Sequence, residues 1–387
     1  MVKRLLCAGC AAVLLAASLA GCGSTASPSA SPSASASSAA SASADPAMAG
    51  WEKYTASWYD VFDTVTTVIG YASSEEEWDR QMDALHQDLA EYHQLYDIYN
   101  HYEGVTNLYD LNRSAAQGPV AVDQRIMDLL VESREMYKTT SGQMNVAFGA
   151  VLSIWHDYRE AGLNDPDSAQ LPPMEQLTAA SEHCSIDDLV LDEEAGTVYF
   201  ADDQLQLDVG SVGKGYAVEM VARAAEERGL ASAILSVGGN VRTIGHKPDG
   251  SRWTAGIQDP WASAELAGQV VNDAPYLVSV YMKDMALVTS GDYQRFYEVD
   301  GERYNHIIDP DTLMPADHFS AVAVLVPDSG LGDCLSTGLF CLPLEDGQAL
   351  VESLDGVEAM WMLKDGSVVY SSGFGDSVKA TLEGYEP

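Results

Sequence analysis

Hydrophobic and polar positions recur along the chain in two patterns, one typical of helices and the other of strands. Spacings of three and four residues run from Trp78 to Leu95, and Ser74 with Glu77 before them has the pattern of a capping box. The same periodicity predicts further helices over residues 123–138, 149–159 and 216–228. Alternating or β-branched runs predict strands over residues 61–69, 204–209, 233–244, 254–257 and 321–326. Because helices and strands interleave, we expect an α/β or α+β fold.

The first residues of the chain carry a targeting pattern instead. Lys3 and Arg4 precede a hydrophobic run over residues 11–19, which is too short to span a bilayer comfortably. This pattern predicts an export signal over residues 1–21. The segment Leu-Ala-Gly-Cys that ends at Cys22 resembles the bacterial lipoprotein signal, in which this cysteine is lipidated. The alternative is an ordinary signal peptide with a chance cysteine. Lipidation would anchor the protein without a transmembrane helix.

A segment of biased composition follows the signal. Residues 24–44 consist only of Ser, Ala, Pro and Thr, without charge or large hydrophobic groups. Such a segment cannot bury a core, so residues 22–48 are expected to form a flexible tether. The folded domain is expected over residues 49–387. These features predict an exported, membrane-anchored lipoprotein on the outer side of the cytoplasmic membrane.

The charge of the chain is strongly negative, with a formal net charge of −38. This balance argues against a nucleic acid partner, because phosphate backbones require a basic surface. Beyond the signal and Cys22, three cysteines remain, Cys184, Cys334 and Cys341. Cys334 and Cys341 lie two helical turns apart, which is too far for a disulfide. We expect all three to be buried thiols rather than redox groups.

A glycine-rich turn stands between the predicted strand over residues 204–209 and the helix that follows. It contains Gly210, Gly213 and Gly215, with Lys214 between the last two. Glycine lets the backbone approach a ligand closely, and the free N–H groups of a helix start attract anions. The functional interpretation is a phosphate site, and the alternative is a simple tight turn. The spacing differs from that of the common P-loop and from the dinucleotide-binding fingerprint.

A second polar pattern follows the predicted strand over residues 321–326. Asp333 and Thr337 are four residues apart, so on a helix capped by Asp328 or Ser329 their oxygens share one face. A carboxylate and a hydroxyl there could complete a Mg²⁺ site together with ligand phosphates and water. The structural alternative is that Asp333 stabilises the helix dipole and Thr337 bonds to the carbonyl four residues earlier.

Three more stretches carry chemically distinctive residues. Glycines 238 and 239 interrupt the predicted strand over residues 233–244, which indicates a bulge or the close approach of another group. The other two stretches are Thr-Ser-Gly-Asp-Tyr at residues 289–293 and His-Ile-Ile-Asp-Pro at residues 306–310. A histidine can accept a proton near neutral pH.

Taken together and in this order, these motifs resemble the ApbE family, the FAD:protein FMN transferases. The resemblance covers residues 49–387 and implies an α/β sandwich of T-fold-like halves. It also implies a reaction in which Mg²⁺-bound FAD is attacked at its pyrophosphate by a threonine of a target protein. FMN is then joined to that threonine through a phosphoester, and AMP leaves.

The resemblance also implies roles for residues of the C-terminal half. Asp333, Thr337 and the backbone carbonyl of Ser211 would hold the Mg²⁺. Residues at FAD-contacting positions are Asp208, Lys214 and Ile307. His306 matches a histidine proposed as the base.

The N-terminal half matches the family more loosely. Phe62, in Phe-Asp-Thr, stands where many relatives have Met-Gly-Thr. Tyr99 aligns with an aromatic residue near the flavin. Gln143, Met144 and Asn145 stand where many relatives have Ala-Phe-Asp. All five positions are expected to contact FAD.

Two other functions fit parts of the same pattern. A hydrolase would let water replace the threonine and would cut FAD to FMN and AMP. A pure flavin-binding lipoprotein would not need Asp333, Thr337 and His306 together. In this family the target threonine lies in a Ser/Thr-Gly-Ala-Thr motif, which this chain lacks. The acceptor is therefore expected to be another exported protein, for example a subunit of a membrane redox complex.

Overall fold

The computed structural model describes residues 43–265 and 276–387. The predicted signal, Cys22 and most of the predicted tether lie outside these residues. Within the described ranges, no helix combines the length and the hydropathy that crossing a bilayer would require. The last residues of the predicted tether form a short 3-10 helix, Pro46–Met48, in which Met48 is buried.

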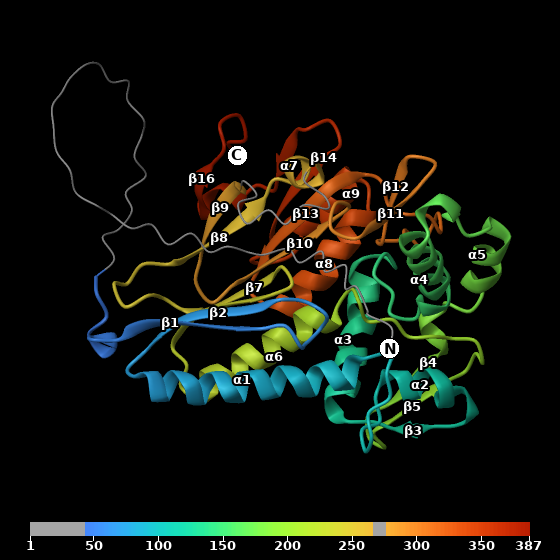
Figure 1. Ribbon diagram of the computed structural model, residues 1–387, viewed down its shortest axis with the longest axis horizontal. Coiled ribbons are helices and arrows are strands. Elements are labelled where there is room, and N and C mark those ends of the chain that lie inside the picture. The colour runs from blue at the N-terminus through green and yellow to red at the C-terminus, as the bar shows by residue number, and fades with distance from the viewer. Residues whose placement is uncertain (1–42, 266–275) are drawn as a thin grey trace.

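An antiparallel sheet of eight strands forms the centre of the molecule (Figure 1). In spatial order the strands are β1 (Glu52–Trp58), β2 (Thr66–Ala72), β6 (Ser232–Val237), β7 (Asn240–Gly245), β10 (Ala286–Gly291), β13 (Phe319–Val326), β14 (Glu358–Leu363) and β15 (Val368–Tyr370). Every residue of β13 is buried, and alternate side chains enter the hydrophobic clusters on opposite faces of the sheet. This strand therefore runs through the middle of the core.

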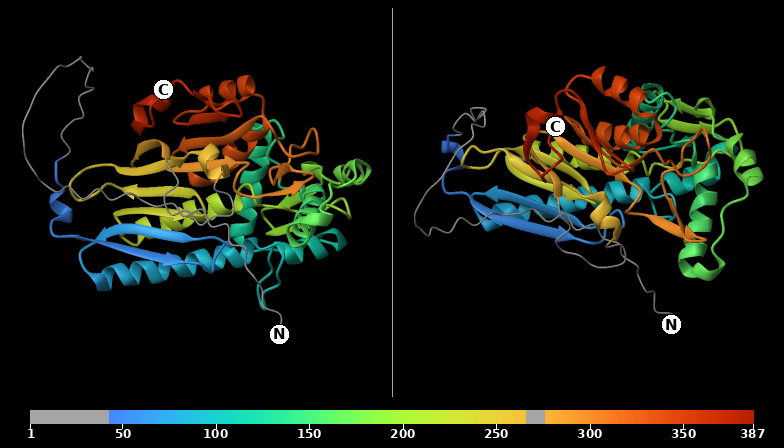
Figure 2. Two further views of the ribbon diagram at one scale, coloured as in Figure 1. Left: turned by 45° about the horizontal axis from the view of Figure 1, so that its top comes forward. Right: turned by 90° about the horizontal axis from the view of Figure 1, so that it is seen from above.

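Helices cover one face of this sheet (Figure 2). They are α1 (Glu75–Tyr96), α3 (Gln124–Thr139), α6 (Gly213–Glu227), α8 (Ser329–Cys341) and α9 (Leu344–Glu352). The Ser74 side chain accepts a hydrogen bond from the N–H of Glu77, and the expected hydrophobic face of α1 is buried. α6 packs on α8, and α8 packs on β10 and β13. The helices predicted from periodicity are thus confirmed.

A small antiparallel sheet covers the other face. It contains β8 (Trp253–Gln258), β9 (Tyr276–Met282) and β16 (Val378–Thr381), and α7 (Pro260–Glu265) follows β8. A hydrophobic cluster that includes Ile257, Val280 and Met360 fills the space between the two sheets. The molecule therefore has three layers, and the predicted α+β class is confirmed.

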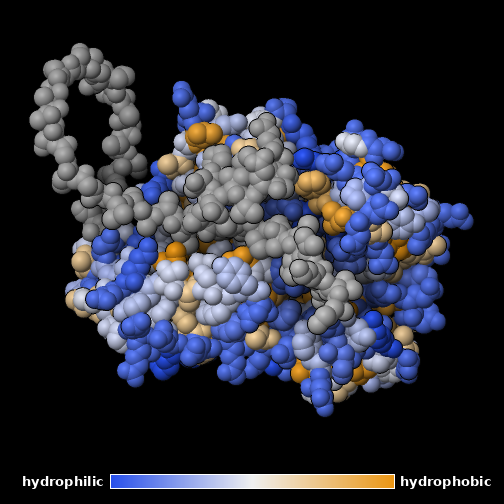
Figure 3. Space-filling model, viewed as in Figure 1, coloured by the Kyte–Doolittle hydropathy of each residue, from blue (hydrophilic) through white to orange (hydrophobic). Residues whose placement is uncertain are grey.

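A lobe beside the end of the large sheet completes the fold, at the right of Figure 1. It contains α2 (Leu108–Ser114), α4 (Gly149–Asn164), α5 (Met174–Ser181), β3 (Val120–Ala121), β4 (Leu189–Asp192), β5 (Thr197–Phe200) and the hairpin of β11 (Phe296–Val299) and β12 (Glu302–Asn305). Four further 3-10 helices are Ala115–Gln117, Pro166–Ser168, Ile186–Asp188 and Phe374–Ser377. The face in Figure 3 is largely hydrophilic, as the acidic composition suggests.

Two of the predicted strands are wrong in detail. Residues 204–209 form no named strand, because their backbone bonds to loops and side chains rather than to a neighbouring strand. The Asn112 side chain donates to the carbonyl of Leu207 and accepts from its N–H. The run over residues 61–69 becomes a strand only at Thr66, because Phe62 and Asp63 adopt positive φ values of 54° and 49°.

The double glycine is a turn rather than a bulge. β6 and β7 form a hairpin in which Val237 pairs with Asn240. Gly238 and Gly239 make the two-residue connection with φ values of 55° and 96°. Two consecutive positive φ values are typical of the tight turns that match strand twist. The bulge, one of the two expected alternatives, is therefore wrong, whereas the close approach is confirmed, because a Cβ on Gly238 would lie 2.6 Å from Thr64 Oγ1. The hairpin places Asn240 at the start of β7.

Candidate functional site

The N-terminal ends of α6 and α8 meet next to the glycine-rich turn. The N–H of Gly215 donates to Asp333 Oδ2 at 2.7 Å. A Cβ atom on Gly215 would lie 2.4 Å from both Asp333 Cβ and the Ser329 carbonyl oxygen. Only glycine fits this contact. The conformation of the turn therefore depends on the packing of two helices that are far apart in sequence.

Lys214 connects this junction with the β6–β7 hairpin. Its Nζ donates to Asn240 Oδ1 at 2.9 Å and lies 3.6 Å from Asp333 Oδ1. Asn240, which holds the lysine, is only 2% exposed, and its own Nδ2 has no hydrogen-bond partner among the described residues. The ammonium group is thereby aimed across the open side of the glycine-rich turn.

A pocket of about 240 Å³ opens over this junction. Its lining brings together all the residues that the sequence assigned to the site except one: Tyr99, Gln143, Met144, Asn145, Asp208, Ser211, Lys214, His306, Ile307, Asp333 and Thr337. These residues come from both halves of the chain. Their convergence supports the resemblance on which they were chosen, although it does not assign a role to each of them.

Phe62 is the exception, since it is not among the lining residues. Its N–H donates to His93 Nδ1 at 3.2 Å, and its ring meets the His93 ring edge-on at 5.5 Å. It packs against the cluster beneath α1. This placement does not support the predicted contact between Phe62 and FAD.

Two oxygen atoms around the pocket have no competing partner among the residues that the structure describes. Among the residues described, none donates to the Ser211 carbonyl, because the N–H of Gly215 bonds to Asp333 instead. The Thr337 hydroxyl forms no hydrogen bond within the described ranges either, so the alternative of a bond to the carbonyl of Asp333 is wrong. That carbonyl accepts from Ser336.

These oxygens together with Asp333 form a donor set for a hard cation. No group of three or more His, Cys, Asp or Glu side chains suited to a metal occurs in the part of the chain that the structure describes. A site with one carboxylate, one hydroxyl and one carbonyl fits Mg²⁺, which takes few protein ligands and shares phosphate oxygens and water. The residues present therefore fit the predicted ion.

His306 lies directly after β12, at the other side of the pocket. Its N–H donates to the Arg295 carbonyl at 3.1 Å, and its Nδ1 lies 3.2 Å from the same oxygen. Because a carbonyl can only accept, Nδ1 carries the proton and Nε2 is left as an acceptor. Burial, with the nearby guanidinium groups of Arg295 and Arg159, lowers the pKa of His306 to about 3. The ring is therefore neutral at physiological pH.

Sequence reasoning missed two arginines of the pocket. Arg159, on α4, lies 3.0 Å from His156 Nδ1 through its Nη2, and burial lowers its pKa. Arg295 is exposed at the pocket and follows the Asp-Tyr-Gln segment after β10. With Lys214 they make a cationic pocket in a very acidic protein, which favours an anionic ligand. The scarcity of basic residues was the signal that could have drawn attention to them.

An aromatic side chain stands at the opening of the pocket. Tyr99 is 58% exposed, and its ring lies 5.1 Å from that of His156. Asp97 Oδ1 accepts from the N–H of Tyr99 at 2.6 Å, which fixes the turn that presents the ring. An exposed, fixed aromatic ring next to an anion site suits a ligand that carries both phosphate and a flat ring system.

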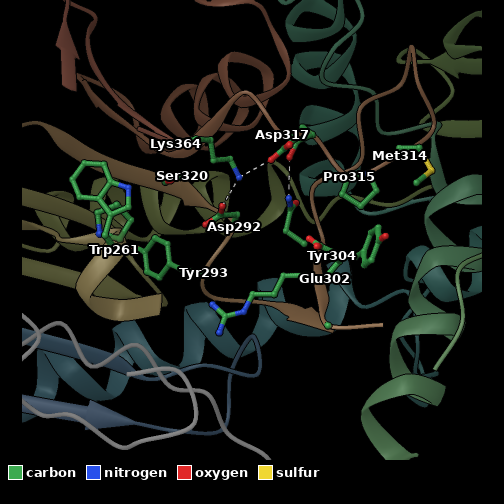
Figure 4. Close-up of a pocket in the computed structure, with 15 residues that line it drawn as sticks. Trp261, Asp292, Tyr293, Glu302, Tyr304, Met314, Pro315, Asp317, Ser320 and Lys364 are labelled. Carbon is green, nitrogen blue, oxygen red and sulfur yellow. Dashed lines mark hydrogen bonds and ion pairs between the residues drawn. The ribbon is translucent and has the colours of Figure 1, made fainter. Parts of the chain in front are cut away.

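A second cavity, of about 580 Å³, lies next to this pocket, and Figure 4 shows the side chains that line it. Asp292 and Asn305 line the second cavity, whereas their neighbours Gly291 and His306 line the first. Lys364 Nζ bridges Asp292 and Asp317, each at 2.7 Å. The second cavity contains none of the residues assigned to the site from the sequence.

Comparisons with known proteins show which family this chain resembles. The profile of the ApbE family matches residues 62–361. The FAD:protein FMN transferase of Treponema pallidum is 32% identical over 286 residues, which cover 70% of this chain and 74% of that protein. The Escherichia coli K12 protein of the same name is 29% identical over 268 residues, which cover 68% and 72%.

Solved structures share the fold. The ApbE protein of Thermotoga maritima superposes with a TM-score of 0.73 at 23% identity, covering 85% of this chain and all of that one. The apo flavinyl transferase ApbE of Pseudomonas stutzeri gives 0.69 at 24%, covering 86% and 98%.

The fold, together with the family profile and these relatives, defines an α+β enzyme of the flavin transferase class. The chain belongs to the ApbE family. The predicted family and the predicted class of enzyme are both confirmed.

Proposed function

We propose that the protein transfers FMN from FAD to a threonine side chain of another protein and releases AMP. The observation that carries the proposal is the convergence of Lys214, Asp333, Thr337 and His306 on one pocket. The names of the relatives support the class of reaction. The threonine acceptor and the release of AMP rest on the resemblance and on the chemistry of the pocket.

The residues divide between binding and proton transfer. Lys214 attracts the pyrophosphate through its ammonium group, while the N–H of Gly215 at the start of α6 stays bonded to Asp333. Asp333, Thr337 and the Ser211 carbonyl would hold Mg²⁺, which when bound neutralises charge on the phosphates. Nε2 of His306 accepts the proton of the attacking hydroxyl. The new bond joins the threonine Oγ to the phosphorus of FMN, and the P–O bond to AMP breaks.

The proposal extends to the place where the reaction occurs. The Leu-Ala-Gly-Cys segment supports lipidation of Cys22, and the uncharged segment after it supports a tether to the membrane. The acceptor would then be an exported protein with a Ser/Thr-Gly-Ala-Thr motif on the same side of the cytoplasmic membrane.

A single incubation separates the candidate reactions. The domain from Ser43 is mixed with FAD and Mg²⁺, with and without an acceptor that carries Ser-Gly-Ala-Thr, and the masses of acceptor and nucleotides are measured. An FMN-sized mass gain together with AMP supports the transferase. Free FMN and AMP with unmodified acceptor would show a hydrolase, and unchanged FAD would leave only flavin binding. Asp333→Ala should abolish the reaction while the circular dichroism spectrum is unchanged.

A further inference from the structure

A buried carboxylate outside the pocket holds the two helices of the site together. Glu219, on α6, is 1% exposed and does not line the pocket. Its Oε2 accepts from the N–H of Ser329 at 2.9 Å and from Arg242 Nε at 2.8 Å. Its Oε1 accepts from Arg223 Nε at 2.9 Å. Ser329 is the first residue of α8, so a side chain of one helix caps the start of the other.

The same relation holds in the opposite direction. Asp333, one turn into α8, accepts from the N–H of Gly215 at the start of α6. Glu219 lies four residues after Gly215, just as Asp333 lies four residues after Ser329. Each helix therefore places a carboxylate on the N-terminal N–H groups of its partner, where the positive end of the helix dipole favours it.

This pair of contacts determines where the Asp333 carboxylate lies. The two helix starts touch so closely that a Cβ on Gly215 would meet the Ser329 carbonyl at 2.4 Å. Ser329 and Asp333 share one helical turn, so a shift of the helix start moves the carboxylate with it. Metal ligands tolerate displacements of only a few tenths of an ångström.

We infer that Glu219 is a positioning residue for the cation site, which acts by holding the N–H of Ser329 so that Asp333 faces the pocket. The inference rests on the proposed function, because it concerns the ion that Asp333 would bind. Arg242, 5% exposed, neutralises Glu219, and Arg223 supports it from the surface. Both arginines therefore balance the charge of Glu219, and neither belongs to the proposed metal ligands.

A substitution at Ser329 can remove the contact without replacing any of the charged residues around Glu219. Proline lacks the N–H and is favoured at the first position of a helix. Asp328 before it has φ −124° and ψ 126°, values that a residue preceding proline adopts readily. Ser329→Pro therefore removes the bond to Glu219, and Ser329→Ala is the matched control that keeps the N–H.

The test measures binding of Mn²⁺ in the presence of FAD and without acceptor, followed by the loss of the free Mn²⁺ signal in electron paramagnetic resonance. Ser329→Pro should weaken Mn²⁺ binding about 10- to 100-fold, the range typical of residues that orient metal ligands. Ser329→Ala, which keeps the N–H donor, should remain within about threefold of the wild type. Folded Ser329→Pro protein that binds Mn²⁺ as Ser329→Ala does would overturn the inference.

If Ser329→Pro does not fold, a second variant still tests the inference. Glu219→Leu with Arg242→Met replaces the buried ion pair by hydrophobic groups, a change that proteins often tolerate. This variant should show the same weakened binding, and wild-type binding would refute the inference. Asp333→Ala is the reference. Wild-type protein that binds Mn²⁺ no better than Asp333→Ala would instead reject the cation site itself, and with it the proposed function.

Discussion

At the scale of single residues, Gly215 shows how a common motif acquires a specific function. The sequence indicates a glycine-rich turn, but such turns occur widely. The structure adds the reason for the glycine, which is the contact with Ser329 and Asp333 across the helix junction. That contact could not be predicted, because nothing local in the sequence reveals which helix start will face the turn.

Two alanine substitutions test this interpretation. In Gly215→Ala the new Cβ meets backbone and Cβ atoms that cannot move freely, so we expect a loss of about 1 to 3 kcal/mol in the free energy of unfolding, with loss of FMN transfer. Gly239→Ala is the control, since φ is +96° but no atom lies within 4 Å of the new Cβ. It should cost about 1 kcal/mol from backbone strain alone. Urea denaturation and a transfer assay measure both effects, and equal losses of activity would contradict the close-contact argument.

His306 provides a second test at this scale. With its pKa lowered to about 3 by burial and by Arg295 and Arg159, the imidazole should stay neutral as the pH falls from 8 to 5. Its ring signals in nuclear magnetic resonance spectra of the ligand-free protein should therefore not shift over this range. His306→Asn identifies the signals by their disappearance. A titration midpoint near the ordinary histidine value of about 6.5 would show that the ring is solvated and that the two arginines do not lower its pKa.

The residues of the site could be predicted where they lie in local motifs, and less well elsewhere in the pocket. Asp208, Lys214, Asp333 and His306 lie in local motifs, and the structure brings them to one pocket. Phe62 was assigned by alignment with Met-Gly-Thr, but it lies against His93 instead. A loop whose backbone has positive φ at two successive residues can direct a side chain in ways that a loose motif match does not specify.

At the scale of elements, the start of α8 faces an acidic side chain from α3. Glu132 lies near Asp328 and Glu219, and Arg223 offsets part of this negative charge. Burial, together with the charge of Asp328, raises the pKa of Glu132 to about 7. The folded protein thus binds a proton that the unfolded chain has already released. The contribution of Glu132 to stability should be fully present below the unfolded pKa and should be lost as the pH rises from about 4.5 through 7.

Glu132→Gln removes the repulsion between Glu132 and the neighbouring carboxylates of Asp328 and Glu219. At pH 8 we expect it to stabilise the protein by about 1 to 2 kcal/mol, after allowing for partial solvent screening, and to raise Tm by about 2 to 6 °C. At pH 4 the variant and the wild type should unfold at similar temperatures, which makes the acidic measurement the internal control. Calorimetry across this pH range measures the difference, and a gain that does not depend on pH would point to packing rather than charge.

Elements formed by interactions between residues close in the sequence could be predicted, whereas elements that depend on residues far apart could not. Helices α1 and α3 followed from their own periodicity and from their caps at Ser74 and Asp123. The segment at residues 204–209 has the alternation of a strand, but its hydrogen bonds go to the Asn112 side chain and to a loop. The pairing of β6 with β7 required two positive φ values that a double glycine permits but does not demand.

At the scale of the whole molecule, the boundary of the folded domain can be tested by truncation. The N–H of Asp45 donates to the Pro248 carbonyl at 2.9 Å, and Met48 is 6% exposed. A chain that begins at Ser43 should match the stability of one that begins at Cys22. A chain that begins at Gly50 should lose about 1 to 3 kcal/mol, because the Met48 side chain no longer covers its site. Equal stability of all three in urea would show that the short 3-10 helix contributes nothing.

The arrangement of the layers was predictable only in outline. Interleaved helices and strands indicated the α+β class, and the resemblance to the ApbE family indicated its topology. Pattern alone could not show that residues as distant as Tyr99 and Thr337 line one pocket, because that depends on the order of strands in the sheet. Nor could it find the reciprocal caps of α6 and α8, since each carboxylate alone is an ordinary helix residue.

The distance of 3.6 Å between Lys214 Nζ and Asp333 Oδ1 also affects how the metal ion and the nucleotide bind together. In the ligand-free protein the ammonium group already neutralises the carboxylate that the proposed cation would need. A divalent ion binding alone must compete with this lysine, whereas phosphates that attract the lysine remove the competitor. Nucleotide and metal should therefore bind with positive cooperativity, and by reciprocity each should raise the affinity for the other by the same factor.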